Sequence, residues 1–138
     1  MDKTGPIVLI DDDDDDLQLL IEIFADLNLR NEIHFFKNTA SVISFLQRPD
    51  VNPFLIISDV NMPVMNGFEL KRKFAADPVI RAKKIPYLFF SSNPNVIAIS
   101  TDEMDAYQGI FRKPVKKSEW REMFNTIVKY WTYSDPTD

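Results

Sequence analysis

The sequence predicts an α/β fold: an open parallel β-sheet of five strands, with helices on both faces to give a three-layer sandwich. Apolar segments recur along the chain, and segments with helical periodicity lie between them. Three of the apolar segments, IVLI, FLIIS and YLFFS, lack the alternating polar positions of a half-exposed strand. Such runs are typical of strands that helices cover on both faces. The alternation of strand and helix predicts a (βα)5 order with right-handed crossovers.

The five predicted strands are short and evenly distributed. They are Pro6–Asp11, Glu32–Lys37, Phe54–Asp59, Pro86–Ser91 and Gly109–Arg112. In open parallel sheets, a binding site lies outside the carboxyl ends of the strands. We therefore look for functional residues at the ends of these segments.

The segment after the first strand is predicted to be an amphipathic helix. Its apolar residues recur at spacings of three and four and form one stripe: Leu17, Leu20, Ile21, Phe24 and Leu27. Asp13 or Asp14 is expected to cap this helix, because a carboxylate accepts hydrogen bonds from the first turn and favours the positive end of the helix dipole.

Four further helices are predicted. The second begins at Thr39 or Ser41 and ends before Pro49, the third runs from about Phe68 to Ala76, and the fourth lies within residues 95–107. The last helix has the clearest apolar face: Trp120, Phe124, Ile127, Val128 and Trp131. We expect its two tryptophans to pack in the core, although aromatic residues on a terminal helix leave a homodimer open as an alternative.

Composition limits the class of protein. The 138 residues are 45% hydrophobic, which is enough for one domain spanning residues 1–138. The net charge of -5 argues against nucleic-acid binding, and the lack of cysteine excludes disulfides, thiolate zinc sites and thiol catalysis. The chain has neither a signal-peptide pattern nor an apolar run of bilayer length, so we expect a cytoplasmic protein without a membrane partner.

Charged and polar side chains mark the ends of four predicted strands. Asp11 and Asp12 end the first, Asp59 the third and Ser91 the fourth, and Lys113 follows the fifth. If the first and third strands are neighbours, three carboxylates converge, and their repulsion requires a proton, a cationic side chain or a divalent metal. Hard oxygen ligands in a wet cleft suit Mg²⁺.

Two other groups of residues are assigned away from this site. The remaining acids of the aspartate run, residues 13–16, are interpreted as capping and solvated helix residues. The only histidine, His34, is predicted to lie on an outer strand away from the cleft.

Four segments, in order, resemble one known family. IVLIDDD, LIISDVNMPVMNGFEL, IPYLFFSS and GIFRKPV together are similar to a response-regulator receiver domain. The resemblance implies a flavodoxin-like sheet of strand order 2-1-3-4-5. The spacer AADPVIRAKKIP and the terminal aromatic helix resemble small stand-alone regulators of the phytochrome-associated type.

The resemblance also implies a role for each strand-end residue. Asp59 would be the phosphoacceptor. Asp12 and Asp59 would ligate Mg²⁺ directly, Asp11 would act largely through water, and the backbone carbonyl of Asn61 would be a further ligand. Lys113 would pair with phosphoryl oxygens, and Ser91 would donate its hydroxyl to one of them.

Backbone features and one departure complete the comparison with the family. Gly67 is expected to close the loop after Asp59 where a positive φ is cheap, and the Lys113–Pro114 bond is expected to be cis by resemblance. The family links switching to an aromatic ring three residues before the lysine. Here Ile110 occupies that position.

The expected function is that of a two-component response regulator without an output domain. A histidine kinase or histidine phosphotransfer protein would donate the phosphoryl group, and an unknown downstream protein would receive the signal by contact. The protein would not be an enzyme beyond assisting its own phosphorylation and dephosphorylation. Two alternatives stay open: a magnesium-dependent phosphohydrolase with an aspartate nucleophile, and an adaptor that never carries phosphate. The hydrolase would need a general acid where this chain has Asn61.

Overall fold

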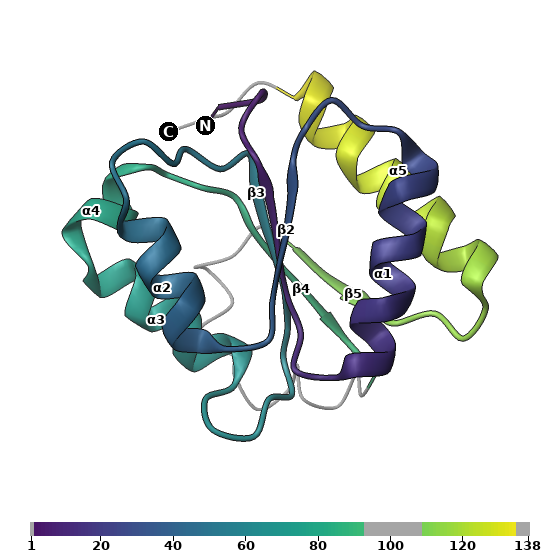
Figure 1. Ribbon diagram of the computed structural model, residues 1–138, viewed down its shortest axis with the longest axis horizontal. Coiled ribbons are helices and arrows are strands. Elements are labelled where there is room, and N and C mark those ends of the chain that lie inside the picture. Colours follow the sequence, from purple (N-terminus) through teal and green to yellow (C-terminus); the bar gives the residue numbers. More distant parts are fainter. Residues whose placement is uncertain (1, 93–108, 135–138) are drawn as a thin grey trace.

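The computed structural model describes residues 2–92 and 109–134. Its centre is a parallel sheet with strand order β2-β1-β3-β4-β5 (Figure 1). The strands are β1 (Ile7–Ile10), β2 (Ile33–Phe36), β3 (Leu55–Asp59), β4 (Tyr87–Ser91) and β5 (Gly109–Arg112). The predicted fold class and strand order are confirmed.

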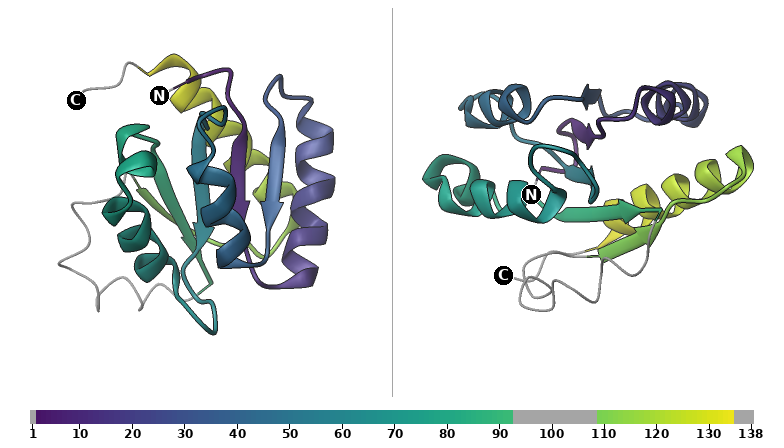
Figure 2. Two further views of the ribbon diagram at one scale, coloured as in Figure 1. Left: turned by 60° about the vertical axis from the view of Figure 1, so that its left-hand side comes forward. Right: turned by 90° about the horizontal axis from the view of Figure 1, so that it is seen from below.

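Helices cover both faces of this sheet (Figure 2). Their bounds are α1 (Asp14–Leu27), α2 (Thr39–Gln47), α3 (Gly67–Ala76), α4 (Pro78–Ala82) and α5 (Lys117–Tyr133). Helices α1 and α5 lie together on one face, and α2, α3 and α4 lie on the other (Figure 1). None of the helices in the described part of the chain is both long and apolar enough to cross a membrane.

The sheet separates two hydrophobic cores, because side chains alternate along each strand. Ile7 and Leu9 pack toward α1 and α5, whereas Val8 and Ile10 pack toward α2 and α3. The apolar face predicted for α5 is confirmed: Trp120, Phe124, Ile127 and Val128 are buried, and Trp131 packs against them.

Short polar side chains cap the starts of α1, α2 and α3. The Asp13 carboxylate accepts hydrogen bonds from the backbone N–H groups of Asp15 and Asp16, and Asn38 caps α2 in the same way. Asn66 and Glu69 form a reciprocal capping box at the start of α3. These caps fix where α1, α2 and α3 begin and so fix the loops after β1, β2 and β3 at the carboxyl edge of the sheet.

Two predictions about helices need correction or extension. Ile21 was predicted on the apolar stripe of α1 but is 44% exposed, and Ile23 is buried in its place. The spacer after α3 contains the short helix α4, which begins with Asp77 as its N-cap and Pro78 as its first residue. The helix predicted within residues 95–107 lies outside the described residues.

Two predictions about the backbone were wrong. Gly67 does not have a positive φ. A Cβ atom at Gly67 would lie 2.4 Å from the backbone oxygen of Asp59, so close approach to that residue explains the glycine. The Lys113–Pro114 bond is trans, as are the other peptide bonds of the described residues.

Candidate functional site

The register of the sheet brings the strand ends together. Ile10 pairs with Ser58 across β1 and β3, so Asp11 and Asp59 follow paired positions at the same edge. Ser91 pairs with Arg112 across β4 and β5, which places Lys113 at this edge as well. The predicted convergence of the first and third strands is therefore present.

Three carboxylates form a compact group there. Ligand oxygens of Asp11, Asp12 and Asp59 all lie within 4.8 Å of one another. Asp11 and Asp59 are buried, and Asp12 is half-buried. Buried charges of one sign need compensation from a cation or a proton.

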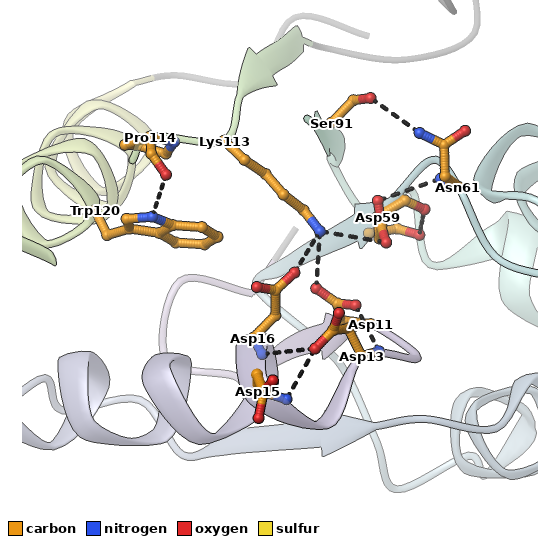
Figure 3. Close-up of polar contacts among 11 residues, drawn as sticks. Asp11, Asp13, Asp15, Asp16, Asp59, Asn61, Ser91, Lys113, Pro114 and Trp120 are labelled. Atoms are coloured by element: carbon orange, nitrogen blue, oxygen red, sulfur yellow. Dashed lines mark hydrogen bonds and ion pairs between the residues drawn. The ribbon is translucent and has the colours of Figure 1, made fainter. Parts of the chain in front are cut away.

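Lys113 supplies a positive charge from β5. Its Nζ lies 2.7 Å from Asp16, 3.2 Å from Asp11 and 3.3 Å from Asp59 (Figure 3). The Lys113 side chain is only 10% exposed, and its Nζ lies 4.8 Å from the centroid of the Phe90 ring. A single ammonium group thus faces carboxylates from β1, α1 and β3.

The backbone around Lys113 is held on both sides. Its N–H donates to the Ser91 carbonyl at 2.8 Å, which continues the pairing of β4 and β5. The Trp120 Nε1–H donates to the Pro114 carbonyl at 2.6 Å and anchors the loop to α5. These two contacts direct the Lys113 side chain across the cleft toward α1 and β3 (Figure 3).

The ionisation of the site reflects its burial. Burial raises the pKa of Asp11 to about 7, although the Asp13 N–H and the Lys113 charge oppose this shift. Burial likewise raises the pKa of Asp59 above its usual range, against the charge of Lys113. Burial alone would lower the pKa of Lys113, but hydrogen bonding to Asp16 and the charges of Asp11 and Asp59 outweigh it and raise that pKa. The acids are therefore short of positive charge even with Lys113 in place.

Asn61 and Ser91 lie beside Asp59. The Asn61 backbone N–H donates to Asp59 Oδ1 at 3.2 Å, and its side-chain amide donates to the Ser91 hydroxyl oxygen at 3.4 Å. Ser91 is 2% exposed, and Asn61 is exposed. All the residues predicted for the site from the sequence therefore lie at one edge of the sheet.

An open cleft of about 970 Å³ lies over Asp12, Asp59, Asn61 and Lys113. Its walls include the acids at the start of α1, Asp59, Asn61 and the loop from Arg112 to Val115. The carboxylates of Asp12 and Asp59 thus face an open space large enough for a hydrated ion and a phosphoryl group.

The donor set fits a divalent cation with hard oxygen ligands. Asp11, Asp12 and Asp59 offer carboxylate oxygens, and the cleft leaves room for water and phosphate oxygens, as Mg²⁺ requires. The raised pKa values of Asp11 and Asp59 agree with a site that lacks positive charge. The residues present therefore suit a magnesium ion.

Asp16 was missed by the sequence interpretation, which treated it as a solvated helix residue. It makes the shortest contact with Lys113, and its side chain is 26% exposed. The helical period places Asp16 on the same face of α1 as Leu20 and Ile23, four and seven residues later, which are both buried. An acid on that inward stripe, just before the core begins, faces the edge of the sheet.

His34 lies apart from this cleft, as predicted. It is on the outer strand β2, where its ring lies 4.6 Å from the Phe45 ring and its Nε2 lies 3.4 Å from Glu32. Neither contact involves the strand-end acids.

Comparison with known proteins identifies the family. The model of the response regulator receiver domain matches residues 7–125, and the chain therefore belongs to this family. No curated protein matches the chain by sequence.

Solved structures with the same fold include a phosphorylated regulator and two metal-bound receivers. The phosphorylated cyanobacterial phytochrome response regulator RcpA is 20% identical, with a TM-score of 0.79 and 96% of each chain covered. The Mn²⁺-bound response regulator Rcp1 is 19% identical, with a TM-score of 0.73 and coverage of 97% of this chain and 99% of that one. The receiver domain of a Pseudomonas aeruginosa sensor histidine kinase, with Mg²⁺ in its active-site cleft, is 19% identical. Its TM-score is 0.68, with coverage of 94% and 98%. These likenesses support the flavodoxin-like fold.

Proposed function

We propose that this receiver domain accepts a phosphoryl group on Asp59 in a magnesium-dependent reaction and passes the signal on by protein contact. The donor would be a histidine kinase or a histidine phosphotransfer protein. One observation carries the proposal: the Asp59 carboxylate groups with Asp11 and Asp12, as a divalent cation requires, and also lies 3.3 Å from the Lys113 ammonium. Membership of the receiver family supports the same role.

The reaction requires a carboxylate oxygen that faces the cleft, as Asp59 has, and charge neutralisation around phosphorus. An oxygen of Asp59 attacks the phosphorus atom of a phosphohistidine, so a P–O bond forms and the P–N bond breaks. The imidazole leaves with the electron pair of the broken bond. Asn61 N–H orients Asp59 through Oδ1, while Lys113 faces Oδ2 and can pair with the incoming oxygens.

The metal completes this arrangement. Asp11, Asp12 and Asp59 would hold Mg²⁺, and the Asn61 carbonyl is proposed as a further ligand. When bound, the ion would supply positive charge against the phosphoryl oxygens and lower the barrier to attack by an anionic nucleophile.

The residue two positions after Asp59 argues against sustained hydrolysis. It is Asn61, and an amide cannot protonate a leaving group or activate water as a carboxyl group does. The aspartyl phosphate would therefore persist long enough to act as a signal rather than turn over rapidly. Ser91 and Lys113, at adjoining strand ends, would sense the added oxygens.

Ile110 restricts the conformational changes that could follow phosphorylation. It packs on the side of the sheet covered by α2 and α3, whereas Phe111 packs on the α5 side. Because residue 110 is isoleucine, this protein has no aromatic ring that could rotate at that position. Switching would then depend on Ser91, Lys113 and their backbone. Phosphoacceptance itself needs no ring at this position.

Intact-mass spectrometry after incubation with acetyl phosphate tests the proposal. The wild-type protein should gain one phosphoryl group with Mg²⁺ and none with excess chelator. Asp59→Asn should abolish the gain, while Asp50→Asn, at an exposed carboxylate paired with Arg48, should leave it unchanged. An unmodified wild-type mass would support an adaptor instead. Continuous release of inorganic phosphate from small phosphomonoesters would support a hydrolase.

A further inference from the structure

The Lys113 ammonium donates hydrogen bonds to Asp16 and Asp11 and forms an ion pair with Asp59. A lysine has three N–H donors, and three carboxylates surround this one: Asp16, Asp11 and Asp59. A phosphoryl group on Asp59 would add oxygens that compete for these donors, so Lys113 can pair with more than one of them only by releasing a carboxylate.

The three carboxylates differ in what such a release would cost. The side chain of Asp11 is 0% exposed, so water cannot readily replace the ammonium there, and Asp59 is the residue that would carry the phosphoryl group. Both also belong to the group of acids suited to a metal. Asp16 is 26% exposed and stands outside that group, so water can solvate its carboxylate after release.

The backbone positions of Asp16 and Lys113 are both fixed, whereas the Lys113 side chain can rotate. Asp16 is the third residue of α1, and its N–H donates to the capping carboxylate of Asp13 at 3.1 Å. The backbone of Lys113 is tied to Ser91 and, through Pro114, to Trp120. Movement of the ammonium between Asp16 and Asp59 therefore requires only rotation within the Lys113 side chain.

We propose that Asp16 is a positioning residue for Lys113: it holds the ammonium in the resting site and releases it to the phosphoryl group once Asp59 is phosphorylated. This inference rests on the proposed phosphoacceptor role of Asp59. Asp16 thus competes with the phosphoryl group for Lys113 and favours the unphosphorylated state.

The chain offers a matched control on the same helix turn. Asp15 carries the same charge and is exposed, and its carboxylate points away from Lys113 (Figure 3). Asp15→Asn and Asp16→Asn remove equal charge from the start of α1, but only the second removes the contact with Lys113. A general electrostatic effect would appear in both variants.

Two measurements on the wild type and both variants test the inference. The first is the rate at which an acylating reagent modifies the Lys113 amine in the resting protein, followed by peptide mapping. The second is the affinity for beryllofluoride, a phosphoryl mimic, at saturating Mg²⁺. Asp16→Asn should raise the acylation rate and tighten beryllofluoride binding, each by about tenfold, as expected for loss of a charge-assisted hydrogen bond. Asp15→Asn should change each by less than about twofold, since an exposed charge is screened.

The outcomes separate this inference from the proposed function. An unchanged Lys113 acylation rate in Asp16→Asn, or equal effects in the two variants, overturns the inference. Weaker beryllofluoride binding in Asp16→Asn overturns the competition, because Asp16 would then assist the phosphorylated state. If the wild-type protein does not bind beryllofluoride, both the release of Lys113 from Asp16 and the proposed phosphoacceptor role of Asp59 are refuted. Asp16→Glu, which keeps the charge, should restore a slow acylation rate if the contact itself matters.

Discussion

Replacing Lys113 with methionine tests how strongly one ammonium compensates the buried acids. Lys113→Met keeps the length of the side chain but leaves Asp11, Asp59 and Asp16 without their shared cation. Breaking a buried ion pair costs about 3–5 kcal/mol. Because Asp16 can be hydrated and Asp11 can take up a proton, we expect the free energy of unfolding to fall by about 2–4 kcal/mol at about pH 8.

The same substitution should cost less in acid. The pKa of Asp11 is about 7 even with Lys113 present, and that of Asp59 is also raised by burial. At about pH 5 these carboxyl groups bind protons in the folded variant, so the loss should shrink to about 1 kcal/mol.

Urea unfolding without divalent cations, followed by circular dichroism at both pH values, measures these losses. Lys117→Met is the control, because its ion pair with Glu22 is about half exposed and should contribute about 0.5 kcal/mol or less. A loss for Lys113→Met that is independent of pH, or no larger than the control, would refute the reasoning.

Three further predictions concern pH, helix packing and the loop after Asp59. In the wild type without metal, the raised pKa of Asp11 means that the folded state binds more protons, so the free energy of unfolding should fall as pH rises from about 4 to about 7. Mg²⁺ should stabilise the protein more at about pH 7 than at about pH 4 and so reverse this loss. A melting temperature that does not respond to Mg²⁺ at either pH would contradict the prediction. Lys83 Nζ donates to the carbonyls of Leu46, Arg48 and Val51, so Lys83→Met should cost about 1–3 kcal/mol in urea unfolding, against little for Lys73→Met. Gly67→Ala should cost about 1–3 kcal/mol and slow phosphorylation, because the new Cβ meets the Asp59 carbonyl; an unaltered rate and stability would show that the loop can shift freely.

The sequence was sufficient to predict most of the fold and most of the site. Continuously apolar strands require cover on both faces, and the parallel arrangement then puts every strand end at one edge. With the strand order that the family resemblance implies, this arrangement predicts that Asp11, Asp59 and Lys113 lie together. Charge repulsion among the acids gave the reason for a cation.

Other features depend on tertiary contacts that no local pattern contains. The Asp16–Lys113 pair joins residues 97 positions apart, and a solvated acid and a paired acid look alike within an aspartate run. The reason predicted for a glycine at position 67, a positive φ, was wrong. Its close approach to Asp59 depends on the path of the end of β3, which no local pattern contains. Ile23 rather than Ile21 lies on the buried face of α1, where it packs in the core shared with α5.

The most direct test of the central claim is to locate the phosphoryl group on the chain. Borohydride reduces an aspartyl phosphate to homoserine, so protein treated with acetyl phosphate and Mg²⁺ can be reduced, digested and sequenced by mass spectrometry. We predict homoserine at position 59 and unmodified aspartate at positions 11, 12 and 16. Homoserine at another position, with Asp59 intact, would contradict the account.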